Sequence, residues 1–261
     1  MNGIDVSKHN GAIDWIKVKQ DGVDFAILRL GLGKYPSQKD TFFDTNYKGC
    51  KANDIHVGAY WYSYAKTPEE AVQEANACIT CLTNTQLDMP IYFDFEETAG
   101  LALGKQKISA IISAFLDTVE KAGYYVGLYM SRSPLMNLVS EDIRKKYTIW
   151  VAEWNSSTCY PDPYDMWQRA CNGDVKGIKG NVDLDICYKD FPTIIKQKGL
   201  NNYVSVGTSF TDICVDLDDH EGRIMIDDDP MKQPAEDGTV GCIIKIGDKK
   251  YVGVLREQPP D

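Results

Sequence analysis

The sequence lacks features that would place the protein in a membrane or on nucleic acid. No apolar run approaches the roughly 20 residues that a membrane-spanning helix needs. The 28 basic residues are outnumbered by 38 acidic ones, and the net charge of −10 argues against binding to nucleic acid. The sequence does not show the basic start and following apolar segment that are typical of a secretory signal. We therefore expect neither membranes nor nucleic acids as partners.

Residues that hold metal ions are also scarce. The three histidines, His9, His56 and His220, are far apart in the sequence, and Cys78 and Cys81 have no second pair to complete a zinc site. Neither a metal centre nor a cofactor is indicated. The eight cysteines could form four disulfides, but a chain of this length can build its own core. We expect free, mostly buried thiols instead.

Short apolar runs alternate with longer amphipathic stretches over the first 190 residues. This alternation is typical of parallel strands covered by helices, and eight candidate strands predict closure into a barrel. The predicted strands are Gly3–Val6, Phe25–Leu30, His56–Tyr62, Pro90–Phe95, Tyr125–Tyr129, Ile149–Ala152, Tyr164–Gln168 and Asp183–Cys187. The predicted helices are Ile13–Lys19, Phe42–Ala52, Pro68–Leu82, Lys105–Ala122 and Leu135–Val139. Little helix separates the last three strands, so the expected fold is a TIM-like (β/α) barrel with irregular last strands.

The most informative segment is the run Met89–Glu97, in which an apolar strand ends in two acids. Residues two apart on a strand share a face, so Asp94 and Glu96 should project together while Phe93 and Phe95 face the other way. Two adjacent carboxyl groups at a buried strand end favour a raised pKa, which a general acid needs. The alternative is an ordinary strand end with two solvated acids.

Further motifs surround this acid pair in a fixed order. They are Gly3–Gly11, Phe25–Gly31, Val57–Tyr64, Gly127–Ser131, Trp150–Trp154, Trp167–Gln168 and Gly180–Asp185. With the pair itself, this set closely resembles glycoside hydrolase family 25, the lysozymes that cut peptidoglycan. The resemblance covers about residues 1 to 190. It implies a peptidoglycan hydrolase, an N-acetylmuramidase that cleaves β-1,4 bonds between N-acetylmuramic acid and N-acetylglucosamine.

The resemblance also implies roles for particular residues. Glu96 matches the family's proton donor, and Asp94 would stabilise positive charge or orient the substrate's N-acetyl group. Asp5 and Asp183 match two further site acids that would tune Glu96. The candidates for substrate binding are four aromatic residues, whose faces could stack on sugars, and one cationic residue. These candidates are Arg29, Tyr62, Tyr129, Trp154 and Trp167. Arg29 could instead pair with a site carboxylate.

The residues after the barrel differ in composition. We expect a catalytic domain at 1–198 and a small acidic β-rich module at 199–261, with a strand at 222–227 and a hairpin at 241–255. An exposed edge at Cys242–Ile246 could pair with a second copy and make a homo-oligomer. Without a visible signal, an endolysin-like protein would stay in the host cytoplasm until its release to the cell wall, or it would be secreted by another route. The alternatives are a wall-binding or virion protein with secondary catalysis, and a chitinase-like glycosidase.

Overall fold

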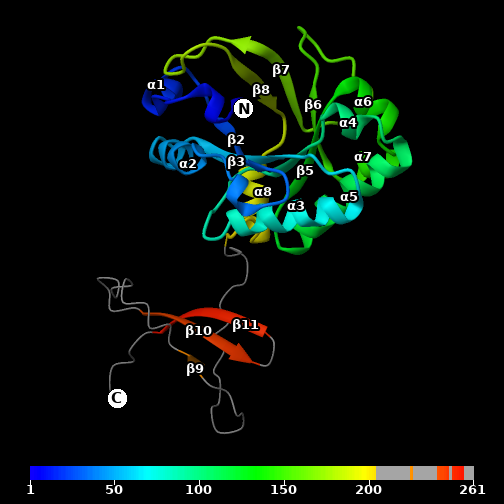
Figure 1. Ribbon diagram of the computed structural model, residues 1–261. Helices are drawn as coiled ribbons and strands as arrows, with labels where there is room; N and C mark the ends of the chain where they lie inside the picture. The colour runs from blue at the N-terminus through cyan, green and yellow to red at the C-terminus, as the bar shows by residue number, and fades with distance from the viewer. Residues whose placement is uncertain (204–223, 226–239, 247–248, 256–261) are drawn as a thin grey trace, which may run out of the picture. The chain divides into compact units, whose positions relative to one another are not determined.

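The computed structural model describes residues 1–203 in full and the backbone of strands at 224–225, 240–246 and 249–255. The first of these parts is a closed eight-stranded barrel (Figure 1). Its strands are β1 (Asn2–Val6), β2 (Phe25–Leu32), β3 (His56–Tyr62), β4 (Ile91–Asp94), β5 (Val126–Ser131), β6 (Thr148–Ala152), β7 (Met166–Gly173) and β8 (Val182–Cys187). The mixed α/β barrel that the sequence predicts is therefore present.

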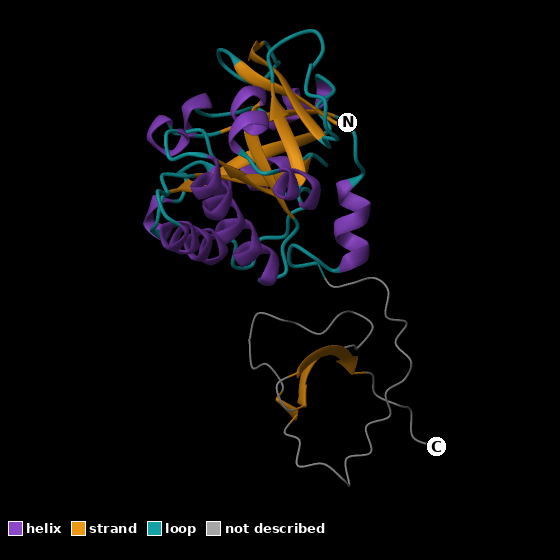
Figure 2. Cartoon of the chain, turned by 90° about the vertical axis from the view of Figure 1, so that its right-hand side faces the viewer, coloured by secondary structure: helices purple, strands orange, loops and turns teal. Residues whose placement is uncertain are grey.

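Helices occupy the connections between the first six strands, on the outside of the barrel (Figure 2). They are α1 (Trp15–Gln20), α2 (Phe43–Ala52), α3 (Pro68–Cys81), α4 (Thr98–Leu101), α5 (Lys105–Lys121), α6 (Arg132–Leu138) and α7 (Glu141–Lys146), with short 3-10 turns η1 (Lys8–Asn10) and η2 (Pro36–Gln38). Helix α8 (Phe191–Lys198) follows the last barrel strand. No helix in the described residues is both long and apolar enough to cross a membrane.

Three short helices, α4, α7 and α8, were not predicted, although the ends of α7 and α8 carry clear signals. Helix α8 is capped by the side chain of Asp190 and ends at Gly199, whose φ of 61° suits glycine. Helix α7 has acids in its first turn and bases in its last, as the helix dipole favours. Both helices have eight residues or fewer, so their apolar periodicity is too short to recognise.

The direction of the last strand decides which residues meet. Strands β1 to β7 run parallel, whereas β8 runs antiparallel to both of its neighbours, β7 and β1. The start of β8 therefore lies beside the carboxyl ends of the other strands. In register, Asp183 pairs with Asp5, and Asp185 pairs with Gln168.

Side chains alternate between two cores. The outer core, between strands and helices, contains Trp61, Phe93 and Phe95, which confirms that the two phenylalanines face away from the acid pair. The inner core fills the barrel with aromatic rings, and Trp150 packs against Tyr129 with ring centroids 4.4 Å apart. Glycine faces these rings where no side chain fits. At Gly127, a Cβ would lie 2.5 Å from the Tyr92 ring.

The chain forms two compact units, 1–208 and 209–261. Residues just after the predicted domain end at 198 bind to the barrel. The buried Asn201 side chain donates to the carbonyls of Leu87 and Met89 and accepts from the backbone of Tyr125. The boundary of the catalytic domain and the role of the second unit stay predictions.

In the second unit, β9 (Ile224–Met225), β10 (Val240–Ile246) and β11 (Lys249–Leu255) form an antiparallel sheet in the order β11-β10-β9. Strand β10 therefore pairs with β11 on one side and, at Ile243 and Ile244 alone, with the short strand β9 on the other. Part of the expected free edge at Cys242–Ile246 is thus paired, and its use in oligomerisation stays a prediction. The hairpin turn at 247–248 lies outside the described residues, and so do the side chains of this unit.

Six of the eight cysteines lie in the part of the chain that the structure describes in full, and all six are free thiols. Cys50, Cys78 and Cys187 are buried, while Cys159 and Cys171 are exposed. The state of Cys214 and Cys242 lies outside the described side chains, so the expectation of free thiols stays a prediction for the chain as a whole.

Candidate active site

Carboxyl groups gather at one rim of the barrel, inside the strand ends. Asp94 is the last residue of β4, Glu96 follows it, Asp5 lies near the end of β1, and Asp183 lies at the start of β8. Between them, the register places Tyr62 beside Asp94 and Asp94 beside Tyr129. The structure thus brings together all four predicted acids and the two predicted tyrosines.

The charge of Glu96 influences the protonation of Asp94. Burial raises the pKa of Asp94 well above its ordinary value, the charge of Glu96 raises it further, and the charge of Arg29 lowers it. Glu96 lies on the open rim, but burial among surrounding protein atoms and then the charge of Asp183 raise its pKa as well. One oxygen of Asp94 is buried with no hydrogen-bond partner in the described residues. The pair therefore retains a proton at a pH where isolated carboxyl groups have lost theirs.

A second acid pair lies deeper in the barrel. Burial raises the pKa of Asp5 well above its ordinary value, and the charges of Asp185 and Asp183 add to the effect. Burial likewise raises the pKa of Asp185, to about 8. One oxygen of Asp185 accepts a 2.9 Å hydrogen bond from Trp150, while the other is buried without a partner in the described residues. A proton shared between Asp5 and Asp185 would satisfy that second oxygen.

Within residues 1–203, Arg29 pairs with Asp40 rather than with one of the predicted site carboxylates, which corrects that expectation. Its Nε lies 2.7 Å from Asp40, and both side chains are largely buried. Asp40 also accepts from the backbone amides of Lys8 and Phe42, so it is held in place from three directions. Because Asp40 follows a loop rather than a strand, strand alternation does not predict this partner. Arg29 still acts on Asp94 through its charge.

The predicted aromatic residues separate into different environments. Trp154 is 62% exposed at the rim, and Tyr62 is partly exposed with its ring 5.2 Å from that of Tyr64. Tyr129 is buried, and its hydroxyl donates to Gln168. Trp167 points outward into the core beneath the helices, where its indole donates to the carbonyl of Glu153. Its ring is therefore not available to stack on a sugar in the barrel mouth.

Two inward-facing residues of the site were not identified from the sequence. Asp185 is two residues from Asp183, and Gln168 is the inward neighbour of Trp167. Strand alternation predicts the inward position of Asp185, because residues two apart share a face. For Gln168, alternation says only that it and Trp167 face opposite sides, and the tertiary structure decides which of the two faces inward.

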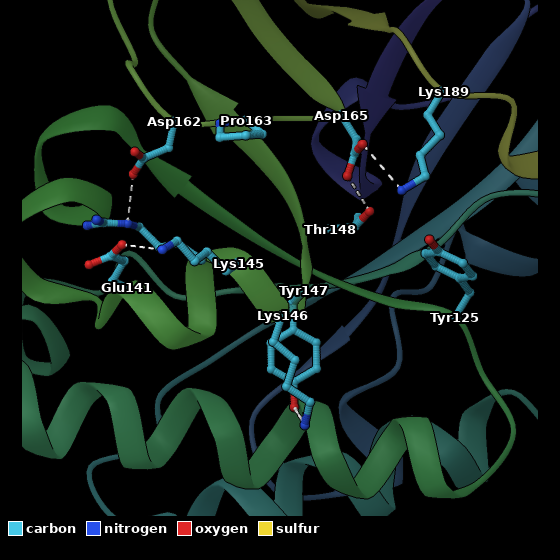
Figure 3. A pocket seen from close by; sticks show the side chains of 11 residues that line it. Tyr125, Glu141, Lys145, Lys146, Tyr147, Thr148, Asp162, Pro163, Asp165 and Lys189 are labelled. Carbon is cyan, nitrogen blue, oxygen red and sulfur yellow. Dashed lines mark hydrogen bonds and ion pairs between the residues drawn. The ribbon is translucent and has the colours of Figure 1, made fainter.

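The cavity in Figure 3 lies at the other end of the barrel. Tyr125, Thr148 and Asp165 lie at or just before the starts of β5, β6 and β7, and Lys189 follows the antiparallel β8. The cavity measures about 270 Å³, and Figure 3 shows Thr148 and Lys189 both directed at Asp165. Lys189 forms an ion pair with Asp165 at 3.3 Å. The cavity is therefore lined by structural ion pairs and is not part of the acidic site. In the part of the chain that the structure describes, no group of three or more His, Cys, Asp or Glu side chains is arranged to hold a metal ion.

Relatives of known structure share this fold. The modular autolysin LytC from Streptococcus pneumoniae, solved in complex with a synthetic peptidoglycan ligand, is 32% identical with a TM-score of 0.63, over 70% of this chain and 46% of that one. The CTP1L endolysin is 27% identical with a TM-score of 0.65, over 75% of this chain and 69% of that one.

Among curated proteins, the autolytic lysozyme of Clostridium acetobutylicum is 27% identical over 186 residues, which is 71% of this chain and 55% of that protein. The chain thus matches only about half the length of that relative. The sequence model described as Glycosyl hydrolases family 25 matches residues 4–178, more than half of the chain. Asp183 lies beyond the match, so its place at the site rests on the strand register. By this match, and by the barrel it shares with these relatives, the chain belongs to glycosyl hydrolase family 25.

Proposed function

We propose that this protein is a lysozyme of the N-acetylmuramidase type, which hydrolyses β-1,4 bonds after N-acetylmuramic acid in bacterial peptidoglycan. The observation that carries the proposal is the Asp94–Glu96 pair on the barrel rim, whose pKa values are raised by burial and by neighbouring charge. Membership of family 25 supports the same reaction class. Cutting a glycan needs a proton for the leaving oxygen and a negative group beside the oxocarbenium-like centre.

Glu96 is the proposed general acid, because it is the member of the pair that reaches the open rim. It would protonate the glycosidic oxygen as the bond to the anomeric carbon breaks. Water would then add to that carbon and return a proton to Glu96. Asp94 would either stabilise the positive centre directly or orient the N-acetyl group so that its amide oxygen attacks the anomeric carbon. Both roles fit a carboxyl group enclosed beside Glu96.

The remaining acids act on Glu96 through charge and hydrogen bonds. Asp183 raises the pKa of Glu96, which keeps the general acid protonated to a higher pH. Asp5 and Asp185 form the network beneath. Trp154 and Tyr62 are the proposed sugar-binding aromatics, since both are accessible on the rim. Arg29, held by Asp40, would supply positive charge to the site rather than a direct contact.

The test is digestion of purified peptidoglycan, followed by mass spectrometry of the new reducing ends. Muramic acid ends support the proposal, while glucosamine ends point to the chitinase-like alternative. No cleavage by well-folded protein would favour a wall-binding or virion protein. Glu96→Gln, run in parallel, shows whether cleavage depends on the proposed acid.

Two further proposals concern the whole protein. Release to the wall from the cytoplasm of a host cell would fit an endolysin-like protein. The second unit would mediate docking or self-association, through β11 or β9, because these are the outer strands of its sheet.

A further inference from the structure

Gln168 connects three parts of the acidic rim. Its side chain is 3% exposed, and it lies on the inner face of β7 opposite Asp185. Its amide oxygen accepts from the hydroxyl of Tyr129 and from the indole nitrogen of Trp154, both at 3.0 Å. Its amide nitrogen donates to Asp5 at 2.8 Å. One buried amide therefore touches an exposed tryptophan, a buried tyrosine and a site acid.

The donors and acceptors fix the orientation of this amide. An indole N–H can only donate, so the oxygen of Gln168 must face Trp154. The amide nitrogen must then face Asp5, and this requires an acceptor there. The Asp5 oxygen that it meets is therefore free of a proton, and a proton shared with Asp185 lies on the other side of the Asp5 carboxyl group. No side chain of this length other than glutamine and a protonated glutamate offers both an acceptor and a donor.

The exposed ring of Trp154 has few other constraints. An indole that is 62% exposed on a loop loses rotational freedom when it binds a sugar, and that loss weakens binding. The hydrogen bond that the indole donates to Gln168 holds the ring before substrate arrives. The same amide holds Asp5, which faces Asp183 and Asp185 on β8 and Tyr60 on β3. Within residues 1–203, Gln168 is thus the one side chain that hydrogen-bonds both to Trp154 and to a site acid.

We propose that Gln168 is a positioning residue that fixes the Trp154 ring as a platform for a sugar of the glycan chain and, at the same time, holds Asp5 as a hydrogen-bond acceptor. This inference rests on the proposed function, because it names a device within the same site. It predicts that one substitution changes both substrate binding and the pH dependence of cleavage, whereas a change at Trp154 changes binding alone.

The test compares three variants on soluble peptidoglycan fragments. Gln168→Met keeps the length of the side chain but removes all three hydrogen bonds, and it should raise KM roughly 2- to 10-fold through the freed Trp154. It should also shift the acidic limb of the pH profile to higher pH, because the bond from Gln168 lowers the pKa of Asp5. Trp154→Phe should raise KM but leave that limb in place. Gln168→Glu should lose about tenfold or more in kcat/KM at neutral pH and recover at low pH, where a protonated acid again donates to Asp5.

The matched control is Gln73→Met, the same chemical change on the exposed face of α3. Wild-type KM and an unshifted acidic limb in folded Gln168→Met would overturn the inference. So would a Gln168→Glu variant whose activity does not recover at low pH.

A second readout does not depend on cleavage. In a ¹⁵N–¹H NMR spectrum, the indole signal that Trp154→Phe removes should move in Gln168→Met. In a ¹³C NMR titration, the carboxyl carbon of Asp5 should titrate at a higher pH in that variant than in the wild type. If the wild type does not cleave peptidoglycan but these signals move, the proposed function fails while the positioning role stands. If the wild type cleaves and the signals do not move, the positioning role fails alone.

Discussion

Replacing Glu96 by Gln separates a catalytic role from a structural one, because the two roles predict changes in stability of opposite sign. The substitution keeps the size of the side chain and removes both its proton and its charge. The charge of Glu96 raises the pKa of Asp94, so the two carboxyl groups repel each other in the folded protein. A structural ion pair would have the opposite effect on that pKa.

The magnitudes follow from these contacts. Loss of a general acid typically costs about 10²–10⁴-fold in kcat, which corresponds to about 3–5 kcal/mol of the barrier. When folding raises the pKa of a carboxyl group, the protein loses stability as the pH rises from the group's unfolded pKa through its folded pKa. Glu96→Gln removes one such group and relieves Asp94. We therefore expect a melting temperature at pH 7 that is equal to or higher than that of the wild type.

The assay measures kcat on peptidoglycan fragments and thermal unfolding on the same preparations. Glu97→Gln is the matched control, because Glu97 caps α4 through the amides of Ala99 and Gly100 and its amide analogue keeps an acceptor oxygen. That control should retain kcat. Near wild-type turnover of Glu96→Gln would refute the assignment of the acid. A large drop in its melting temperature would refute the repulsion on which the argument rests.

Four other outcomes are expected. Asp183→Asn should move the alkaline limb of the kcat profile to lower pH, because the Asp183 charge raises the pKa of Glu96; an unmoved limb in the folded variant would remove Asp183 from the site. Asp185→Asn should gain stability relative to the wild type as the pH rises from about 4 to 8, since Asp185 has a pKa of about 8 in the folded protein. Urea titrations at both ends of this range measure the difference in stability, and a difference that does not change with pH would contradict the prediction. Asn201→Ala should lower the free energy of unfolding by about 3–5 kcal/mol, because two buried backbone carbonyls and one partly buried amide lose their partner, and a change below about 1 kcal/mol by urea titration would contradict this. A chain ending at Tyr203 should cleave peptidoglycan like the full chain but have a lower oligomer mass by light scattering; unchanged mass with lost binding in a wall pull-down would make the second unit a targeting module.

The sequence alone determined the class of fold and the position of the central acids. The alternation of apolar runs with amphipathic stretches requires strands to be covered by helices, and eight such runs close a barrel. The period of two along a strand placed Asp94 and Glu96 together and turned Phe93 and Phe95 away. These inferences depend only on local periodicity, which tertiary contacts rarely reverse in a long, regular strand.

Only the tertiary structure decided how the remaining side chains meet. Asp183 joins Asp5 because β8 runs antiparallel, and strand direction is set by pairing partners rather than by the strand's own residues. Arg29 binds Asp40 on a loop whose path the sequence pattern does not specify. Trp167 faces outward and Gln168 inward, and a shift of one residue in register would exchange them. Which side chains line the site thus depends on register and strand direction, which come from the closure of the whole barrel.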